Sequence, residues 1–149
     1  LVKTSNPSSG ESQDKLIDGR PLYELVAEKV VEWGDASMDG AYSNVGAVVG
    51  ATYPGEAVEL RKSMPHSYFL VPGYGAQGGE ADDILSCFNS DGLGAIINSS
   101  RGILFTHMND IERNNCCKEI YLKSVRQAVI SMRNDIYHTL KNSFANMLY

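Results

Sequence analysis

Two segments rich in small residues have the residue types that bind a phosphate group. Residues 72–79 read Pro-Gly-Tyr-Gly-Ala-Gln-Gly-Gly, and residues 98–102 read Asn-Ser-Ser-Arg-Gly. Small residues leave backbone N–H groups accessible to an anion, and an arginine can form paired hydrogen bonds with phosphate oxygens. We therefore predict a phosphate site to which Ser100 contributes its backbone amide and Arg101 its guanidinium.

Each of these segments follows an apolar run that is typical of a buried strand. The two runs are residues 68–71 and residues 93–97, and each glycine- or serine-rich segment leads into a predicted helix or helical turn. Parallel strands end at the same edge of a sheet, so the two segments are expected to lie at one edge.

The rest of the chain alternates strand and helix patterns in the same way. A strand tail at residues 1–4 and a small-apolar run at residues 45–50 bring the predicted strands to four. Helices are predicted over residues 21–34, from residue 52 to about residue 62, from residue 80, and over residues 114–143. Such alternation predicts an α/β fold with a parallel sheet, either half of an eight-stranded barrel or a small open sheet.

The composition is that of one acidic globular unit. The 149 residues are 43% hydrophobic, with a formal charge of -5 and a pI near 5.1. This is enough for one core, so residues 1–149 are predicted to form a single α/β unit. An acidic chain does not suit general nucleic-acid binding, and no apolar run approaches the ~20 residues of a membrane span. We therefore expect no nucleic-acid or membrane partner and a cytoplasmic location.

The cysteines and histidines do not indicate a disulfide framework or a metal site. The odd number of cysteines lacks Cys-x-x-Cys spacing, and the histidines are scattered along the chain. These residues are Cys87, Cys116, Cys117, His66, His107 and His138. We predict reduced structural thiols and no metal ligands.

A dinucleotide site is an alternative for the first segment, because Gly73, Gly75 and Gly78 satisfy a Gly-x-Gly-x-x-Gly fingerprint. The fingerprint expects an acidic residue at the end of the next strand, where this chain has Arg101 instead, although an arginine could accommodate the 2'-phosphate of NADP. Pro72 at the strand end argues against this reading. Gln77 could reach a ligand as donor and acceptor together.

Four motifs together resemble the C-terminal half of orotidine 5'-phosphate decarboxylase. In chain order they are Thr-Ser-Asn-Pro at residues 4–7, Val-Gly-Ala-Thr at residues 49–52, Val-Pro-Gly-Tyr-Gly-Ala-Gln-Gly-Gly at residues 71–79, and Ile-Asn-Ser-Ser-Arg-Gly at residues 97–102. The resemblance implies strands five to eight of a (β/α)8 TIM barrel, with four parallel strands and covering helices. It covers about residues 1–106.

The resemblance also implies a carboxy-lyase that needs no cofactor and converts orotidine 5'-monophosphate to uridine 5'-monophosphate (UMP) in pyrimidine biosynthesis. By matching motifs, Ser5 would contact the pyrimidine amide edge, Gln77 would bridge base and phosphate, and Arg101 would bind the phosphate. Pro72 and the Ser100 amide would line the same pocket. The family resemblance further implies a homodimer with sites at the subunit interface.

The family's Asp-x-Lys-x-x-Asp catalytic array does not occur in this sequence. We therefore predict that no catalytic residue lies in this chain, that an N-terminal half is missing, and that the chain alone is inactive. The opening residues, which read as the end of a strand without an initiator methionine, also suggest a piece of a longer protein. A non-catalytic nucleotide or sugar-phosphate binding module and an NADP-dependent oxidoreductase domain remain alternatives.

Overall fold

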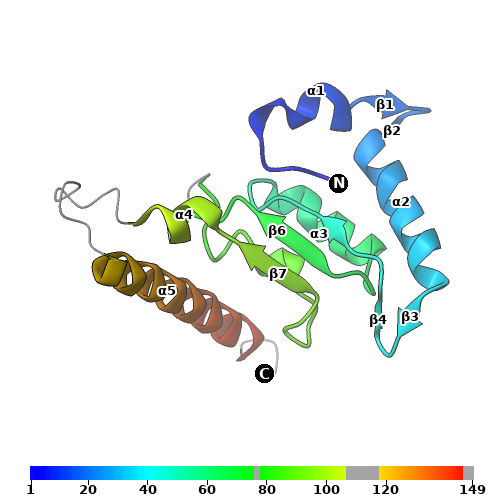
Figure 1. Cartoon of the computed structure of the whole chain (residues 1–149). Coiled ribbons are helices and arrows are strands. Elements are labelled where there is room, and N and C mark those ends of the chain that lie inside the picture. Colours follow the sequence, from blue (N-terminus) through cyan, green and yellow to red (C-terminus); the bar gives the residue numbers. More distant parts are fainter. Residues whose placement is uncertain (76–77, 107–117, 146–149) are drawn as a thin grey trace. The chain divides into compact units, whose positions relative to one another are not determined.

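The computed structural model describes residues 1–75, 78–106 and 118–145. The chain divides into two compact units between Asn98 and Ser99. The first unit contains a parallel sheet with two main helices, and the second contains a short helix and a long one (Figure 1). Each unit is described by itself below.

The sheet of the first unit is parallel, as the alternating pattern predicts. Its strands are β5 (Ala47–Val48), β6 (Phe69–Pro72) and β7 (Ala95–Asn98), in that spatial order. The register pairs Ala47 with Phe69, and Phe69 with Ala95. The predicted strand at residues 1–4 is present as a single parallel bridge between Lys3 and Val49, which places it beside β5.

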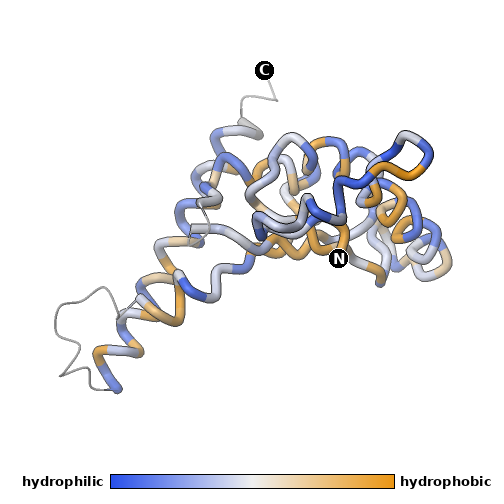
Figure 2. Tube along the Cα trace, turned by 90° about the horizontal axis from the view of Figure 1, so that it is seen from above, coloured by the Kyte–Doolittle hydropathy of each residue, from blue (hydrophilic) through white to orange (hydrophobic). Residues whose placement is uncertain are grey.

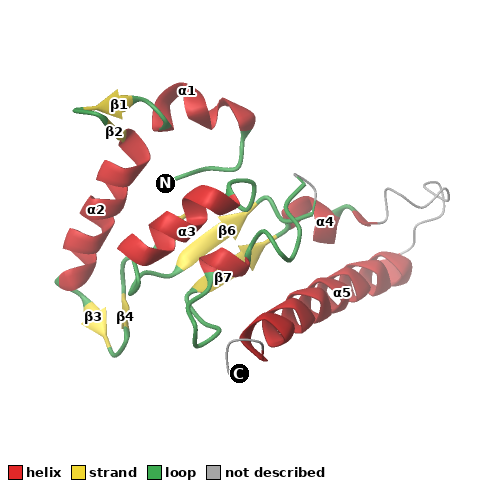
Figure 3. Cartoon of the chain, turned by 180° about the vertical axis from the view of Figure 1, so that it is seen from behind, coloured by secondary structure: helices red, strands yellow, loops and turns green. Residues whose placement is uncertain are grey.

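Two helices of the first unit agree with their predicted ranges. α2 (Leu22–Asp35) starts after Pro21, and α3 (Pro54–Ser63) has a proline in its first turn, where the missing N–H costs nothing. α3 lies over one face of the sheet, which Figures 1 and 3 show from opposite sides. Phe69 and Val71 point to this face and are fully buried.

The opposite face of the sheet is apolar but open. Because side chains alternate along a strand, Val48, Leu70 and Ile96 share this face. Leu70 is 42% exposed and Ile96 58% exposed. Parallel sheets are normally covered on both faces, and the described strands do not close into a barrel. The first unit is therefore an α/β arrangement of the kind that part of a barrel would give.

The helix predicted from residue 80 is wrong. Residues 81–84 form a turn, and only a short 3-10 helix, η2 (Leu85–Cys87), follows. The Glu80 amide donates to the Asp83 carboxylate at 2.9 Å. The segment from residue 80 ends at Cys87, and a stretch this short gains too few helical hydrogen bonds to offset the cost of helix nucleation, which accounts for the difference.

The predictions also missed two short hairpins and a helical turn. β1 (Leu16–Ile17) pairs with β2 (Arg20–Pro21), and β3 (Met38–Asp39) pairs with β4 (Tyr42–Ser43), both antiparallel. Asp18 and Gly19 both have positive φ, as a tight hairpin turn requires, and Asp-Gly is a recognised signal for such a turn. Before the first hairpin, η1 (Pro7–Ser9) leads into α1 (Gly10–Gln13).

The second unit consists of α4 (Ser100–Leu104) and α5 (Lys118–Ala145). Residues 114–117 of the predicted last helix lie outside the described residues. Hydrophilic and hydrophobic residues alternate along α5 (Figure 2), and its described side chains are half-buried or exposed. Within the described ranges, no helix combines the length and apolar character that a membrane span needs.

Candidate functional site

The candidate site lies at the edge of the sheet that contains the C-terminal ends of the parallel strands. Pro72, the last residue of β6, pairs with Asn98, the last residue of β7. The Lys3–Val49 bridge runs in the same direction, so the segment that begins at Thr4 leaves from this edge as well. The segments in which the sequence predicted ligand-binding residues thus follow strand ends at a common edge.

Ser5 is held in place by close contact with the segment after β5. The Gly50 amide donates to the Lys3 carbonyl at 2.7 Å, and the Thr52 hydroxyl donates to the Ser5 carbonyl at 3.2 Å. A Cβ atom added to Gly50 would lie 2.6 Å from the Ser5 nitrogen and 2.8 Å from its Cα atom. Position 50 therefore requires glycine so that the Ser5 backbone can pass. Ser5 itself is half-buried.

Pro72 lies at the same edge and is half-buried, with its carbonyl accepting from the Ala51 amide at 2.8 Å. Gln77 lies outside the described residues, so its predicted role stays a prediction. The loop around it is closed by its own backbone: the Gly75 amide donates to the Gly79 carbonyl at 2.7 Å, and the Gly78 amide to the Gly75 carbonyl at 2.9 Å.

These bonds correct one sequence-based expectation, that of a loop with many accessible N–H groups. The Gly79 amide also donates within the loop, to the Gly73 carbonyl at 3.3 Å. Gly73, Gly75 and Gly78 all have positive φ, so they shape the tight loop. The glycines of this loop therefore serve its backbone conformation, and the amides of Gly75, Gly78 and Gly79 are used inside it.

Ser100 and Arg101 open α4 in the second unit, as the predicted helical turn required. Both residues are exposed. Ser99, which precedes them, is buried, and its carbonyl accepts from the Ile103 amide at 3.0 Å. Arg101 lies in the first turn of α4, which begins two residues after the end of β7. Its carbonyl accepts from the Phe105 amide at 3.1 Å.

Sequence reasoning gave no role to Lys3, which is a buried cation two residues before Ser5. Lys3 is 0% exposed, and its ammonium forms an ion pair with Asp14. It also lies 4.4 Å from the centre of the Tyr53 ring and 5.2 Å from that of the Tyr23 ring. The only signal in the sequence is a lysine within a strand tail, where a charged residue is normally exposed.

A second buried cation, Arg61, lies at the opposite edge of the sheet. Its guanidinium donates to the carbonyls of Cys87 at 3.2 Å, Gly94 at 3.1 Å and Ser67 at 2.7 Å, and to that of Met64. It also stacks on the Phe69 ring, 3.8 Å from its centre. Burial lowers the pKa of Arg61, but a guanidinium keeps its proton in proteins. These contacts join α3 to the starts of β6 and β7.

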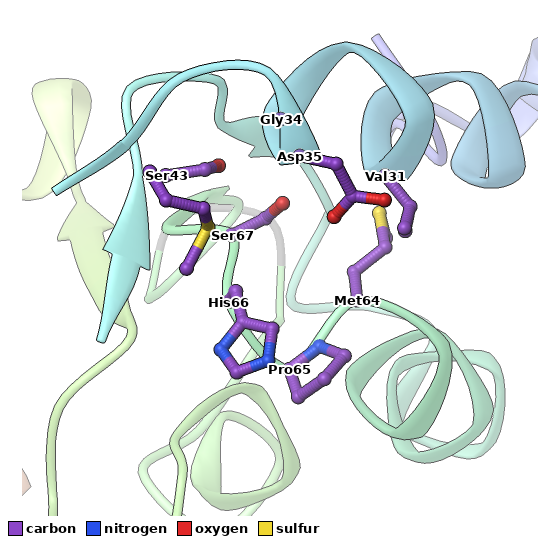
Figure 4. Close-up of a pocket in the computed structure, with 9 residues that line it drawn as sticks. Val31, Gly34, Asp35, Ser43, Met64, Pro65, His66 and Ser67 are labelled. Atoms are coloured by element: carbon purple, nitrogen blue, oxygen red, sulfur yellow. The ribbon is translucent and has the colours of Figure 1, made fainter. Parts of the chain in front are cut away.

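A shallow pocket lies near this opposite edge (Figure 4). Met64, Pro65, His66 and Ser67 line it and precede β6, so it does not include the predicted ligand-binding residues. The His66 ring lies 2.9 Å from the Ala41 carbonyl through Nδ1. In α/β barrels the edge where strands begin is associated with stability, and we assign this pocket no ligand.

The described residues do not suggest a metal or thiol chemistry at the site. No three His, Cys, Asp or Glu side chains of the described ranges lie close enough together to hold a metal ion. Cys87 is buried, and burial raises the pKa of its thiol to about 11. The thiol therefore stays protonated at neutral pH, in agreement with the structural role predicted for it.

Sequence comparison identifies relatives of this chain. It is 48% identical over 137 residues to an orotidine 5'-phosphate decarboxylase from Rhodopirellula baltica, a match that covers 91% of this chain and 45% of the relative. It is 45% identical to the enzyme of that name from Caldicellulosiruptor bescii, with 88% of this chain and 45% of the relative covered. No family model matches the chain.

Solved structures give the same result. A UMP synthase structure from Leishmania donovani matches with a TM-score of 0.62 and 35% identity, covering 85% of this chain and 25% of that one. An OMP decarboxylase structure from the same organism matches with a TM-score of 0.62 and 30% identity, covering 91% and 46%. The chain therefore spans about half the length of the curated relatives it matches.

Proposed function

We propose that this chain, which is homologous to the orotidine 5'-phosphate decarboxylases over about 45% of their length, is the half of such an enzyme that binds the phosphate and base of the substrate. The reaction would convert orotidine 5'-monophosphate to UMP and CO2, without a cofactor. Residues 1–149 would form one α/β unit that supplies strands five to eight of the barrel. The observation that carries the proposal is the edge from which the segments bearing Ser5, Gln77 and Arg101 all depart.

In this proposal Ser5 contacts the pyrimidine, Gln77 bridges base and phosphate, and Arg101 binds the phosphate. Pro72 and the Ser100 amide complete the pocket. Binding energy from the phosphate, which does not react, can close a loop over the base, exclude water and support a carbanion there. The lysine that protonates the carbanion would come from the N-terminal half, because this sequence lacks the Asp-x-Lys-x-x-Asp array.

The open face of the sheet supports a missing half. Leu70 and Ile96 present apolar surface that a barrel interior would cover. The loop geometry argues against the dinucleotide alternative. A dinucleotide site needs a helix directly after the glycine-rich loop, and residues 81–84 form a turn instead.

We further propose that the enzyme is cytoplasmic and that it is a homodimer, as the family resemblance implied. The molecular mass of the active protein in solution tests this proposal. A monomer that turns over substrate would contradict the dimer.

The decisive test compares the chain alone with a completed protein. By completed protein we mean this chain preceded by an N-terminal half, either its own or that of the Rhodopirellula baltica relative. We expect the completed protein to release CO2 from carboxyl-labelled orotidine 5'-monophosphate, and the chain alone to release none. Turnover by the chain alone would refute the argument from the missing lysine. UMP binding without turnover by the completed protein would favour a non-catalytic nucleotide-binding module.

Gly50 offers a test of the Ser5 position. In Gly50→Ala the added methyl group would meet the Ser5 backbone, so Ser5 must move. We expect the completed protein to lose about 1–3 kcal/mol of stability, as overpacked sites do, and to bind UMP about tenfold more weakly. Urea unfolding and calorimetry measure the two effects.

Gly55→Ala is the matched control for this substitution. A Cβ atom at Gly55 meets nothing within 4 Å, and the residue lies in the first turn of α3. We expect Gly55→Ala to leave UMP binding unchanged and to stabilise the protein slightly, because alanine favours a helix more than glycine does. Equal UMP affinities for the two variants would contradict a close packing role for Gly50.

A further inference from the structure

Lys3 is fully buried in the segment that leads to Ser5, which is an unusual place for a lysine. A buried ammonium is unfavourable unless charges or polar groups compensate it. Here the compensation comes from the carboxylate of Asp14 and from the faces of two tyrosine rings, those of Tyr53 and Tyr23.

The groups around this ammonium come from separate elements of the first unit. Asp14 directly follows α1, Tyr23 lies in the first turn of α2, and Tyr53 directly precedes α3. Lys3 itself forms the parallel bridge to Val49 beside β5. One side chain therefore connects three helices to the strand end from which Ser5 departs.

The Lys3–Asp14 pair also closes the loop of residues 4–13. Inside the loop, the Thr4 amide donates to the Gln13 side-chain oxygen at 3.0 Å. The Ser9 hydroxyl donates to the Tyr53 hydroxyl at 3.2 Å, which ties the middle of the loop to the same ring that faces the ammonium. The loop that carries Ser5 is thus fixed at its start, its middle and its end.

We propose that Lys3 is a positioning residue, whose ammonium, held by Asp14, Tyr23 and Tyr53, fixes the loop of residues 4–13 so that Ser5 meets the pyrimidine base. This role rests on the proposed function. Lys3 does not contact the substrate, because its side chain lies against the helices. It acts through Ser5 alone, so it affects recognition of the base and leaves recognition of the phosphate unchanged.

Lys3→Met in the completed protein is the direct test. Methionine keeps most of the length of the side chain and removes its charge, and Asp14, whose side chain is 49% exposed, can return to water. We expect the Kd for UMP to rise about tenfold, which corresponds to the loss of one well-placed hydrogen bond. The Kd for ribose 5-phosphate, which has no base, is expected to change less than about twofold.

Two further variants make the result specific. Asp14→Asn keeps an oxygen acceptor but removes the compensating charge, and it is expected to shift the two affinities in the same pattern. Lys29→Met is the control, because Lys29 pairs with Glu32 on the surface, where both side chains are more than half exposed. It is expected to change neither affinity. Equal weakening of UMP and ribose 5-phosphate by Lys3→Met, or no weakening of either, overturns the proposal.

Hydrogen exchange separates this proposal from the proposed function. In Lys3→Met the backbone amides of residues 4–6, 8 and 9 are expected to exchange about tenfold faster than in the unsubstituted protein, while Lys29→Met leaves them unchanged. Unchanged exchange rates in Lys3→Met would show that Lys3 does not fix the loop of residues 4–13 and would overturn the proposal. If the unsubstituted completed protein binds no nucleotide, the proposed function is wrong, and so is a role for Lys3 in positioning Ser5 against the base. The exchange rates then still show whether Lys3 fixes the loop of residues 4–13.

Discussion

Replacing Arg101 by alanine in the completed protein is expected to weaken UMP binding about 10- to 100-fold and to raise the Michaelis constant for orotidine 5'-monophosphate to a similar extent. A charge-assisted pair of hydrogen bonds between a guanidinium and a phosphate contributes about 1.5–3 kcal/mol, and 1.4 kcal/mol corresponds to a factor of ten. Arg101 is exposed at the start of α4, where a ligand can reach it. Calorimetry with UMP measures the loss.

Uridine supplies the discriminating comparison, because it carries the base without the phosphate. Its affinity is expected to change less than about twofold in Arg101→Ala. Arg126→Ala, which removes another exposed arginine from the second unit, is the control and is expected to leave UMP binding unchanged. Equal losses for UMP and uridine would be evidence against a phosphate contact by Arg101.

Arg61→Met is expected to lower the free energy of unfolding of the completed protein by about 3–5 kcal/mol. The substitution removes a buried cation that serves four backbone carbonyls, and these acceptors are then left with fewer donors in a buried place. It also removes the stacking of the guanidinium on Phe69. Urea denaturation followed by circular dichroism measures the change.

The neighbouring lysine provides a control on the same helix. Lys62 forms an exposed ion pair with Glu59, and both side chains are about two-thirds exposed, so Lys62→Met is expected to change stability by less than about 0.5 kcal/mol. Similar stabilities for Arg61→Met and Lys62→Met would contradict the structural role of Arg61. UMP binding by folded Arg61→Met is expected to persist, because its contacts lie at the edge where the strands begin.

The sequence predicted the strands and helices whose patterns are long or uniform. The apolar run at residues 68–71 became β6, and the repeated apolar residues after Pro21 became α2, because burial of an apolar face determines both. The helix from residue 80 was wrong because its segment ends at Cys87 and is too short for helix propagation to offset the cost of nucleation. The Asp-Gly turn at residues 18–19 carried a usable signal that the strand and helix periodicities did not include.

The candidate site was predictable at the level of segments and less so at the level of contacts. Glycine- and serine-rich segments after apolar runs predicted the edge at which Pro72 lies, whereas Ser5 was found only through the family resemblance. The same glycines did not reveal that the amides of Gly75, Gly78 and Gly79 bond inside their own loop. Lys3 and Arg61 could not be recognised either, since a charged residue is usually exposed and only the fold shows what compensates its burial.

The order of the strands has a consequence for folding. Ala47 pairs with Phe69 and Phe69 with Ala95, so each pairing joins neighbouring strands of the sequence through a short crossover. Pairings over these separations cost less loop-closure entropy than pairings with a distant part of the chain, so they are expected to form first. In the proposed enzyme, the face of Leu70 and Ile96 is covered only later, by the N-terminal half. Until this face is covered, its apolar side chains are exposed to water. Association between partly folded chains then competes with folding.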